Sequence, residues 1–170
     1  MTASPGSTPD AEFEAWYKAQ YRRVFASVYL VSSDRAACAE AVDEAFARAY
    51  ERWSRVSQME SPAGWTWVVA RNALRTSRRA DRRRAAAVAR LSPDSSTAAP
   101  ELAVEVWDAV RRLPTREREV IALRYLAGLR ERDIADALRI SAGTVARTLH
   151  DARHRLAVSL GDAYALEDRS

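Results

Sequence analysis

The chain has 170 residues, of which 48% are hydrophobic and 29% are charged, and its formal net charge is +4. A chain of this size forms one domain or two small ones, and its apolar stretches are far too short to cross a bilayer. The N-terminal segment MTASPGSTPD lacks the basic and apolar parts of a secretion signal. Cys38 is the only cysteine, which excludes an intramolecular disulfide and a multi-cysteine metal site. We therefore expect a cytoplasmic protein with no membrane insertion.

Helical periodicity recurs along the chain, and no segment shows the sustained alternation that is typical of strands. Asp10 is expected to cap a first helix, and Ser33 or Asp34 a second one. Ser61 followed by Pro62 combines a cap with a proline at the first helical position, so it predicts the start of a third helix. The expected apolar stripe of the second helix consists of Val42, Ala45, Phe46, Ala49 and Trp53.

The third helix is expected to end in a run of arginines. Residues 71–84 contain seven arginines and a single acid, Asp81. Guanidinium groups match phosphate geometry, so the run is suited to a polyanion, although a solvated helix end is the alternative interpretation. The following stretch AAAVARLSPDSSTAAP is rich in small residues, serine and proline, and it predicts a flexible linker over residues 85–100.

Helical periodicity returns at Glu101 and stops at Pro114, after which Thr115 is expected to cap a helix that Gly128 closes. Two further helices are predicted over residues 131–138 and from 141 to about 160. Their apolar spacing is typical of a helix-turn-helix that lies in a major groove, and a plain helical hairpin is the alternative. The inner face is formed by Ile134, Ala135, Leu138, Ile140, Val145, Leu149, Ala152 and Leu156, and Thr144, Ala146, Arg147, Thr148, His150, Asp151, Arg153 and His154 face outward.

These elements predict an all-α fold of two small helical domains joined by a flexible linker. We expect an N-terminal tail (1–9), a first domain (10–84), the linker (85–100), a second domain (101–160) and a frayed C-terminal tail (161–170). His150 and His154 have metal-ligand spacing, but no acid or thiol is placed to complete a shell. No metal or other cofactor is therefore expected.

Two stretches of the second half, LPTREREVIALRYLAGL and RDIADALRISAGTVARTLHDAR, resemble region 4 of bacterial RNA polymerase sigma factors. In the first half, AEAVDEAF and SPAGWTWVVARNALRTSRRADRRR resemble region 2 of the same family. Both regions in this order, with a short linker and no domain between them, resemble the extracytoplasmic-function (ECF) group. The resemblance implies a subunit that binds core RNA polymerase at its clamp and flap and directs promoter-specific initiation. An anti-sigma factor is a further partner that the family implies.

The resemblance also implies which residues bind. Region 2 would capture a base flipped out of the −10 element, with Asn72 contacting the base edge and aromatic residues stacking on the single strand. Trp65 and Trp67 are both candidates for stacking, and core packing is the favoured reading for Trp65. The −10 residues implied are Trp67, Arg71, Asn72, Arg75, Arg78 and Arg79. The polymerase-binding residues implied are Asp43, Glu44 and Arg48.

Region 4 would read the −35 element through Arg124, Ser141, Thr144, Arg147, His150 and Arg153. This sequence departs from the family where Ala146 and Asp151 replace basic residues and Arg139 replaces the glycine of the turn. Thr76 also stands where an acid or amide is common, and Arg130 takes the place of a capping serine. We expect weak duplex binding by this module alone, so that specificity depends on polymerase holding both modules on one promoter.

The sequence also bears on three other classes of protein. A stand-alone helix-turn-helix regulator needs a dimerisation surface, and the sequence offers no heptad seam. A sigma-like protein without promoter activity is a further alternative. An enzyme is not expected, because the sequence has no phosphate-binding loop, no metal constellation and no nucleophile with a paired base.

Overall fold

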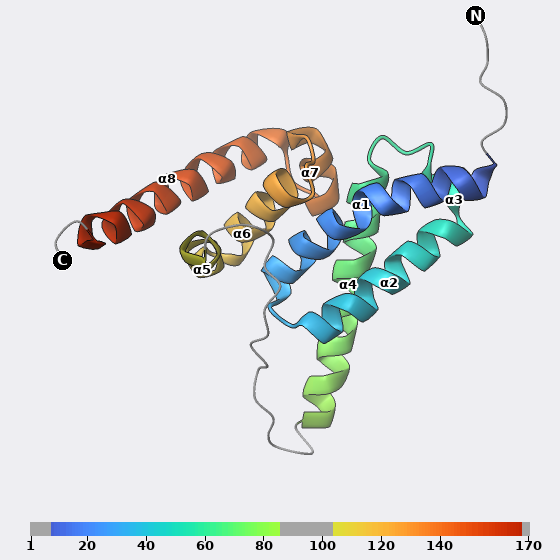
Figure 1. Cartoon of the computed structure of the whole chain (residues 1–170), viewed down its shortest axis with the longest axis horizontal. Helices are drawn as coiled ribbons and strands as arrows, with labels where there is room; N and C mark the ends of the chain where they lie inside the picture. The colour runs from blue at the N-terminus through green and yellow to red at the C-terminus, as the bar shows by residue number, and fades with distance from the viewer. Residues whose placement is uncertain (1–7, 86–103, 168–170) are drawn as a thin grey trace, which may run out of the picture.

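The computed structural model describes the backbone of residues 8–85 and 104–167, and the side chains of residues 8–77 and 104–161. Every regular element in these ranges is helical, as Figure 1 shows, which confirms the predicted all-α fold. The first module contains α1 (Pro9–Ser32), α2 (Arg35–Glu51), α3 (Trp53–Val56) and α4 (Pro62–Ala85). The second contains α5 (Val104–Arg112), α6 (Thr115–Ile121), the π-helical segment η1 (Ala122–Leu126), α7 (Glu131–Leu138) and α8 (Ala142–Glu167).

The helix starts follow local capping chemistry, with two corrections to the prediction. Asp34 accepts from the Ala37 amide at 3.0 Å, and Ser61 Oγ accepts from the Gly64 amide at 3.1 Å, so these caps are confirmed. Asp10 is not a cap, because Pro9 already occupies the first helical position and Thr8 precedes it as the capping residue. Thr115 is likewise the first residue of α6 rather than its cap.

The helix ends differ more from the prediction than the starts. Gly128 has a φ of 72° and ends the α6–η1 segment as expected. This left-handed φ favours glycine, because a residue with a Cβ is strained there. In contrast, α8 does not end near residue 160 but continues to Glu167, because the added residues include the good helix formers alanine, leucine and glutamate. The predicted linker lies outside the described residues, except for Ala85 at the end of α4.

The first module is built from α1, α2 and α4, which pack against one another around the predicted stripe of α2. All five residues of that stripe are buried. Trp16 of α1 joins Trp53 at a ring-centroid distance of 4.9 Å and Phe46 at 5.1 Å. These large rings bury much apolar surface and supply much of the stability of the module.

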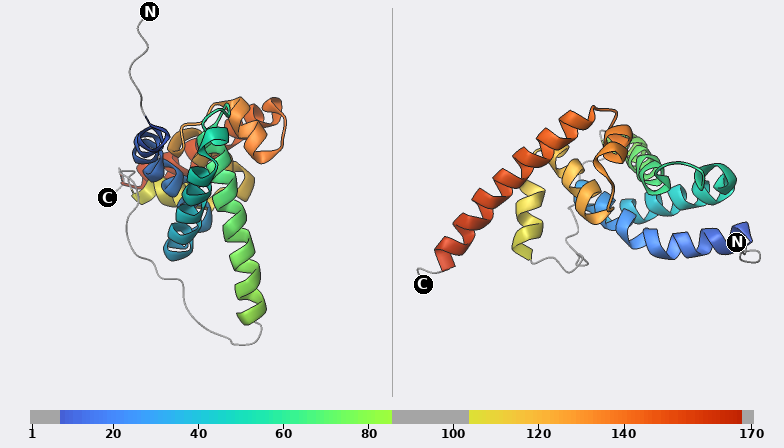
Figure 2. Two further views of the ribbon diagram at one scale, coloured as in Figure 1. Left: turned by 90° about the vertical axis from the view of Figure 1, so that its right-hand side faces the viewer. Right: turned by 90° about the horizontal axis from the view of Figure 1, so that it is seen from above.

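The two modules share one hydrophobic core rather than standing apart. Helix α1 packs against α5, α6 and η1, and α4 packs against α7, as the views in Figures 1 and 2 show. Tyr29 of α1 stacks on Trp107 of α5 with a ring-centroid distance of 5.8 Å. Gly64 is buried where a Cβ would lie 3.5 Å from Leu129 of the second module. The chain therefore adopts a closed arrangement, which the sequence did not predict.

None of the described helices combines the length and the apolar composition that crossing a membrane requires.

Candidate nucleic-acid interface

Helices α7 and α8 form the predicted helix-turn-helix. Ile134, Leu138, Val145 and Leu149 are buried between them, so the predicted inner face is confirmed. The turn contains Arg139 in the left-handed conformation, with φ 54° and ψ 51°. Glycine adopts this conformation without the cost that a Cβ imposes, so the arginine is a strained choice.

The N-terminus of α8 is capped and exposed. Ser141 Oγ accepts a hydrogen bond from the Thr144 amide at 3.1 Å, and the two hydroxyl groups lie 2.8 Å apart. The first amides of a helix have no partner within it, and together with the helix dipole they favour an approaching phosphate. The end of α8 that should meet DNA is therefore chemically suited to it.

The predicted reading residues of α8 lie along one exposed stripe. Ser141, Thr144, Arg147 and His150 follow one another at intervals of three residues, and all four side chains are exposed. No described residue pairs with Arg147 or His150, so both are available to a ligand. Ala146 and Asp151 are exposed as well. Alanine offers no hydrogen bond to a base or phosphate and a carboxylate repels phosphates, so the surface that can read DNA is limited to the four residues of the stripe.

The two remaining residues predicted for the −35 side already have partners. Arg124 is half-buried and donates to the Leu129 carbonyl at 3.0 Å, so it supports the turn at Gly128. Arg153 is exposed, but its Nε donates to the Tyr125 hydroxyl at 2.8 Å, and its guanidinium lies 5.8 Å from the centre of that ring. Arg124 lies in η1 and Arg153 on α8, and Arg153 is the more accessible of the two.

Trp67 is not a surface residue, which corrects its predicted role. It is 1% exposed and packs in the core on the same face of α4 as Ala70 and Leu74. A base cannot stack on a ring that the protein covers on both sides. Trp65 is partly exposed instead and lines a hollow of about 360 Å³. Residues 67, 70 and 74 have the spacing of one helical face, but this spacing alone does not tell which face of α4 is buried.

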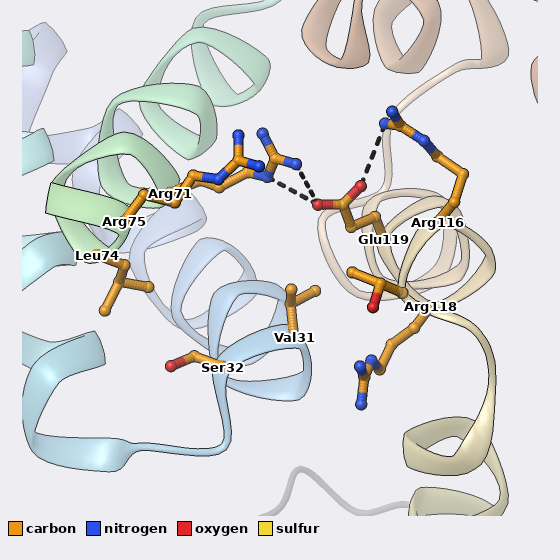
Figure 3. A pocket seen from close by; sticks show the side chains of 9 residues that line it. Val31, Ser32, Arg71, Leu74, Arg75, Arg116, Arg118 and Glu119 are labelled. Atoms are coloured by element: carbon orange, nitrogen blue, oxygen red, sulfur yellow. Dashed lines mark hydrogen bonds and ion pairs between the residues drawn. The ribbon is translucent and has the colours of Figure 1, made fainter. Parts of the chain in front are cut away.

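Arg71 is engaged by a carboxylate of the second module. Its Nε donates to Glu119 Oε1 at 2.8 Å, and Arg116 holds the other oxygen at 3.2 Å, as Figure 3 shows. Glu119 is only 3% exposed, so the ion pair neutralises a buried carboxylate. In the closed arrangement the Arg71 guanidinium is not available to a phosphate, in contrast to the prediction. No sequence pattern indicates this pair, because an acidic residue at position 119 is equally explained by a favourable interaction with the N-terminal end of the α6 dipole.

The other predicted −10 residues lie on the exposed side of α4. Asn72 and Arg75 are exposed and line a hollow of about 300 Å³ whose opposite side is formed by Ala137 and Arg139. Asn72 therefore faces the second module. The backbone of Arg78 and Arg79 continues α4, but their side chains lie outside the described residues.

The predicted polymerase-binding residues are exposed on α2. Arg48 pairs with Glu44 at 2.5 Å, and Asp43 Oδ1 accepts from the Tyr21 hydroxyl at 2.7 Å. Burial and this hydrogen bond raise the pKa of Tyr21 above its ordinary value. Cys38 on the same helix is buried. Among the described residues no group of three or more potential metal ligands lies together.

Comparison with known proteins gives matches for both the sequence and the fold. Residues 103–156 match the family "Sigma-70, region 4". The chain is 31% identical over 145 residues to a probable RNA polymerase sigma factor, RfaY, of Xanthomonas campestris pv. campestris. That match covers 76% of this chain and 36% of the relative, so the chain spans about a third of the length of that protein.

The fold resembles that of the sigma factor RpoE from Bartonella quintana, which was solved in complex with the anti-sigma factor NepR. The TM-score is 0.73 at 18% identity, and the match covers 88% of this chain and 97% of RpoE. The two structures therefore share both helical modules. Residues 103–156 therefore match region 4 of the sigma-70 family, and the fold of the chain is similar to that of a sigma factor.

Proposed function

We propose that the chain is a non-catalytic subunit that gives core RNA polymerase its promoter specificity in the cytoplasm. The observation that carries this proposal is the exposed stripe Ser141, Thr144, Arg147 and His150 on the capped helix α8. Such donors and acceptors at the N-terminal half of a helix suit base edges in the major groove. The match of residues 103–156 to sigma-70 region 4 and the similarity to a probable RNA polymerase sigma factor support the same role.

In this proposal each module has its own target. Residues 101–160 read the −35 element on the polymerase flap, with Arg124 and Arg153 near the DNA backbone. Residues 10–84 bind the clamp through Asp43, Glu44 and Arg48, whose exposure on α2 supports the assignment. Residues 85–100 connect the modules, and residues 1–9 and 161–170 flank them. The RpoE structure contains an anti-sigma factor, and we propose a partner of that class for this chain too.

The first module captures the melted −10 element through Asn72, with Arg71, Arg75, Arg78 and Arg79 holding phosphates. Trp65 stacks on the single strand in place of Trp67, because Trp67 is buried and Trp65 is partly exposed. Because Asn72 shares a hollow with Ala137 and Arg139, a strand that reaches it in the closed arrangement meets the second module. We therefore propose that the two modules separate when the promoter opens.

Run-off transcription tests this proposal directly. Core polymerase is incubated with genomic DNA fragments, with and without the chain, and new start sites are mapped while gel filtration reports the complex with core. New start sites together with a complex support the proposal. A complex without new start sites identifies the alternative, a sigma-like protein without promoter activity. A footprint of a dimer without polymerase identifies a stand-alone regulator.

Asn72→Ala separates base capture from polymerase binding. An amide can both donate to and accept from a base edge, and alanine can do neither. Promoter opening, measured by permanganate reactivity of unpaired thymines, should fall while binding to core is unchanged. Because Asn72 is exposed, this change should leave the stability within about 0.5 kcal/mol. Equal losses of opening and of core binding would contradict the assignment.

A further inference from the structure

A cleft lined by arginines lies at the boundary between the two modules. One hollow of about 430 Å³ extends between α4 and α6, and Figure 3 shows Arg71 and Arg75 reaching from α4 toward Glu119 and Arg116. A second hollow of about 300 Å³ lies between α4 and α7 and shares three of these arginines. The arginines that line the two hollows are Arg71, Arg75, Arg116, Arg118 and Arg139.

The charges of this cleft are not balanced by the protein. Glu119 is the only carboxylate among the lining residues, so five arginines leave a surplus of four positive charges. That surplus equals the formal net charge of the entire chain. Glu119 already pairs with two of the arginines. No described residue forms an ion pair with Arg75, Arg118 or Arg139, and the Nε of Arg118 is buried without a hydrogen-bond partner.

The backbone of Arg139 adds a second observation. Its φ of 54° is unfavourable for any residue with a Cβ, and glycine would remove the strain. Arg139 lines the hollow that Asn72 and Arg75 also line. Strained residues persist where a surrounding function requires the side chain. The strain and the unbalanced charge therefore coincide at the same place.

We propose that this cleft binds a small anion with two or more phosphate groups, which holds the two modules closed. Guanidinium groups bind phosphate oxygens in pairs, and here they approach from both modules. Of the arginines without an ion pair, Arg75 belongs to α4, whereas Arg118 belongs to α6 and Arg139 to the turn after α7. Hollows of this size are typical of small-molecule sites, and a DNA duplex does not fit between packed helices. The site goes beyond promoter recognition, because it requires neither DNA nor polymerase.

Binding has a consequence for the arrangement of the chain. An anion that contacts both modules binds the closed form and not the separated one, so it stabilises the closed form by mass action. Asn72 then stays opposite Ala137 and Arg139, away from a single DNA strand. The anion therefore opposes the opening that promoter capture requires.

Calorimetric titration of the full chain with sodium tripolyphosphate tests the site, with sodium chloride adjusted to constant ionic strength. We expect saturable binding of one anion per chain and a rise in the thermal midpoint, with inorganic phosphate binding more weakly. Arg139→Gly and Arg75→Gln should each weaken tripolyphosphate binding about tenfold, since one charge-assisted contact is lost. Arg22→Gln removes an exposed arginine of α1 outside the cleft, and it should leave binding unchanged.

Arg139→Gly also distinguishes a lost ligand contact from a damaged fold. Glycine relieves the left-handed strain, so the thermal midpoint without anion should rise by about 2–4 °C while affinity falls. Equal weakening by Arg22→Gln would overturn the proposal, because it would reveal diffuse attraction. Absence of saturation would overturn it, and so would binding of a single-stranded oligonucleotide through the same arginines without binding of tripolyphosphate. None of these results depends on transcription, so they are independent of the proposed function.

Discussion

The two surfaces proposed for DNA differ in how much of each is open. On α8, the stripe from Ser141 to His150 is exposed and no described residue covers it. On α4, Trp67 is in the core, Arg71 is held by Glu119, and Asn72 faces α7. The contact that completes the hydrophobic core is thus the contact that covers the −10 side. Stability of the closed chain and access to the −10 surface therefore oppose each other.

The largest effect is expected within the covered surface itself. Trp67→Ala removes a fully buried indole and should lower the free energy of unfolding by about 3–5 kcal/mol. Urea unfolding followed by circular dichroism measures this loss. Trp65→Ala is the matched control on the same helix, and because Trp65 is partly exposed it should cost less and reduce promoter opening selectively. Similar stability losses in the two variants would contradict the contrast between them.

The ion pair between the modules should give the next largest effect. Arg71→Ala leaves the buried Glu119 with Arg116 alone and should cost about 2–3 kcal/mol. Glu119→Gln should cost only about 1 kcal/mol, because the amide still accepts and Arg71, with a side chain 21% exposed, can turn to water. Urea unfolding compares the two, and hydrogen exchange of α6 should rise in both. A larger loss of unfolding free energy in Glu119→Gln than in Arg71→Ala would contradict the view that Arg71 stabilises a buried carboxylate.

On the exposed stripe of α8, truncation of an arginine should weaken DNA binding without lowering the free energy of unfolding. Arg147→Ala should weaken binding to the upstream element by about 1–3 kcal/mol if its guanidinium reads a base. The free energy of unfolding should change by no more than about 0.5 kcal/mol, since the side chain is exposed and unpaired among the described residues. Footprinting of the polymerase complex measures the loss. An unchanged footprint would remove Arg147 from the reading surface.

The smallest effect on DNA binding is expected at Arg153, which lies beside the exposed stripe of α8. Arg153→Ala removes a cation of α8 that already contacts Tyr125, and it should weaken binding to all sequences alike by about 1 kcal/mol. The slope of log affinity against log salt should become shallower by about one. Fluorescence anisotropy with matched and scrambled −35 duplexes at several salt concentrations checks both points. A loss confined to the matched duplex would make Arg153 a base-reading residue instead.

Local features of the fold could be predicted because local chemistry causes them. Ser61 and Asp34 cap helices through side chains that reach amides three residues away, and Gly128 closes a helix in a left-handed conformation that favours glycine. The inner face of the helix-turn-helix follows from helical periodicity alone. The misplaced caps at Asp10 and Thr115 are shifts of one or two residues, which local propensities do not resolve.

The sequence by itself determined the helices, the helix-turn-helix and the residues that its outer face presents. Only the tertiary structure decided that Trp67 is buried while Trp65 is not, because both fit an amphipathic helix until its neighbours are known. It also decided that Arg71 meets Glu119, 48 residues away in the chain. No local pattern encodes such a pair, since its energy arises only when two modules pack and remove the carboxylate from water.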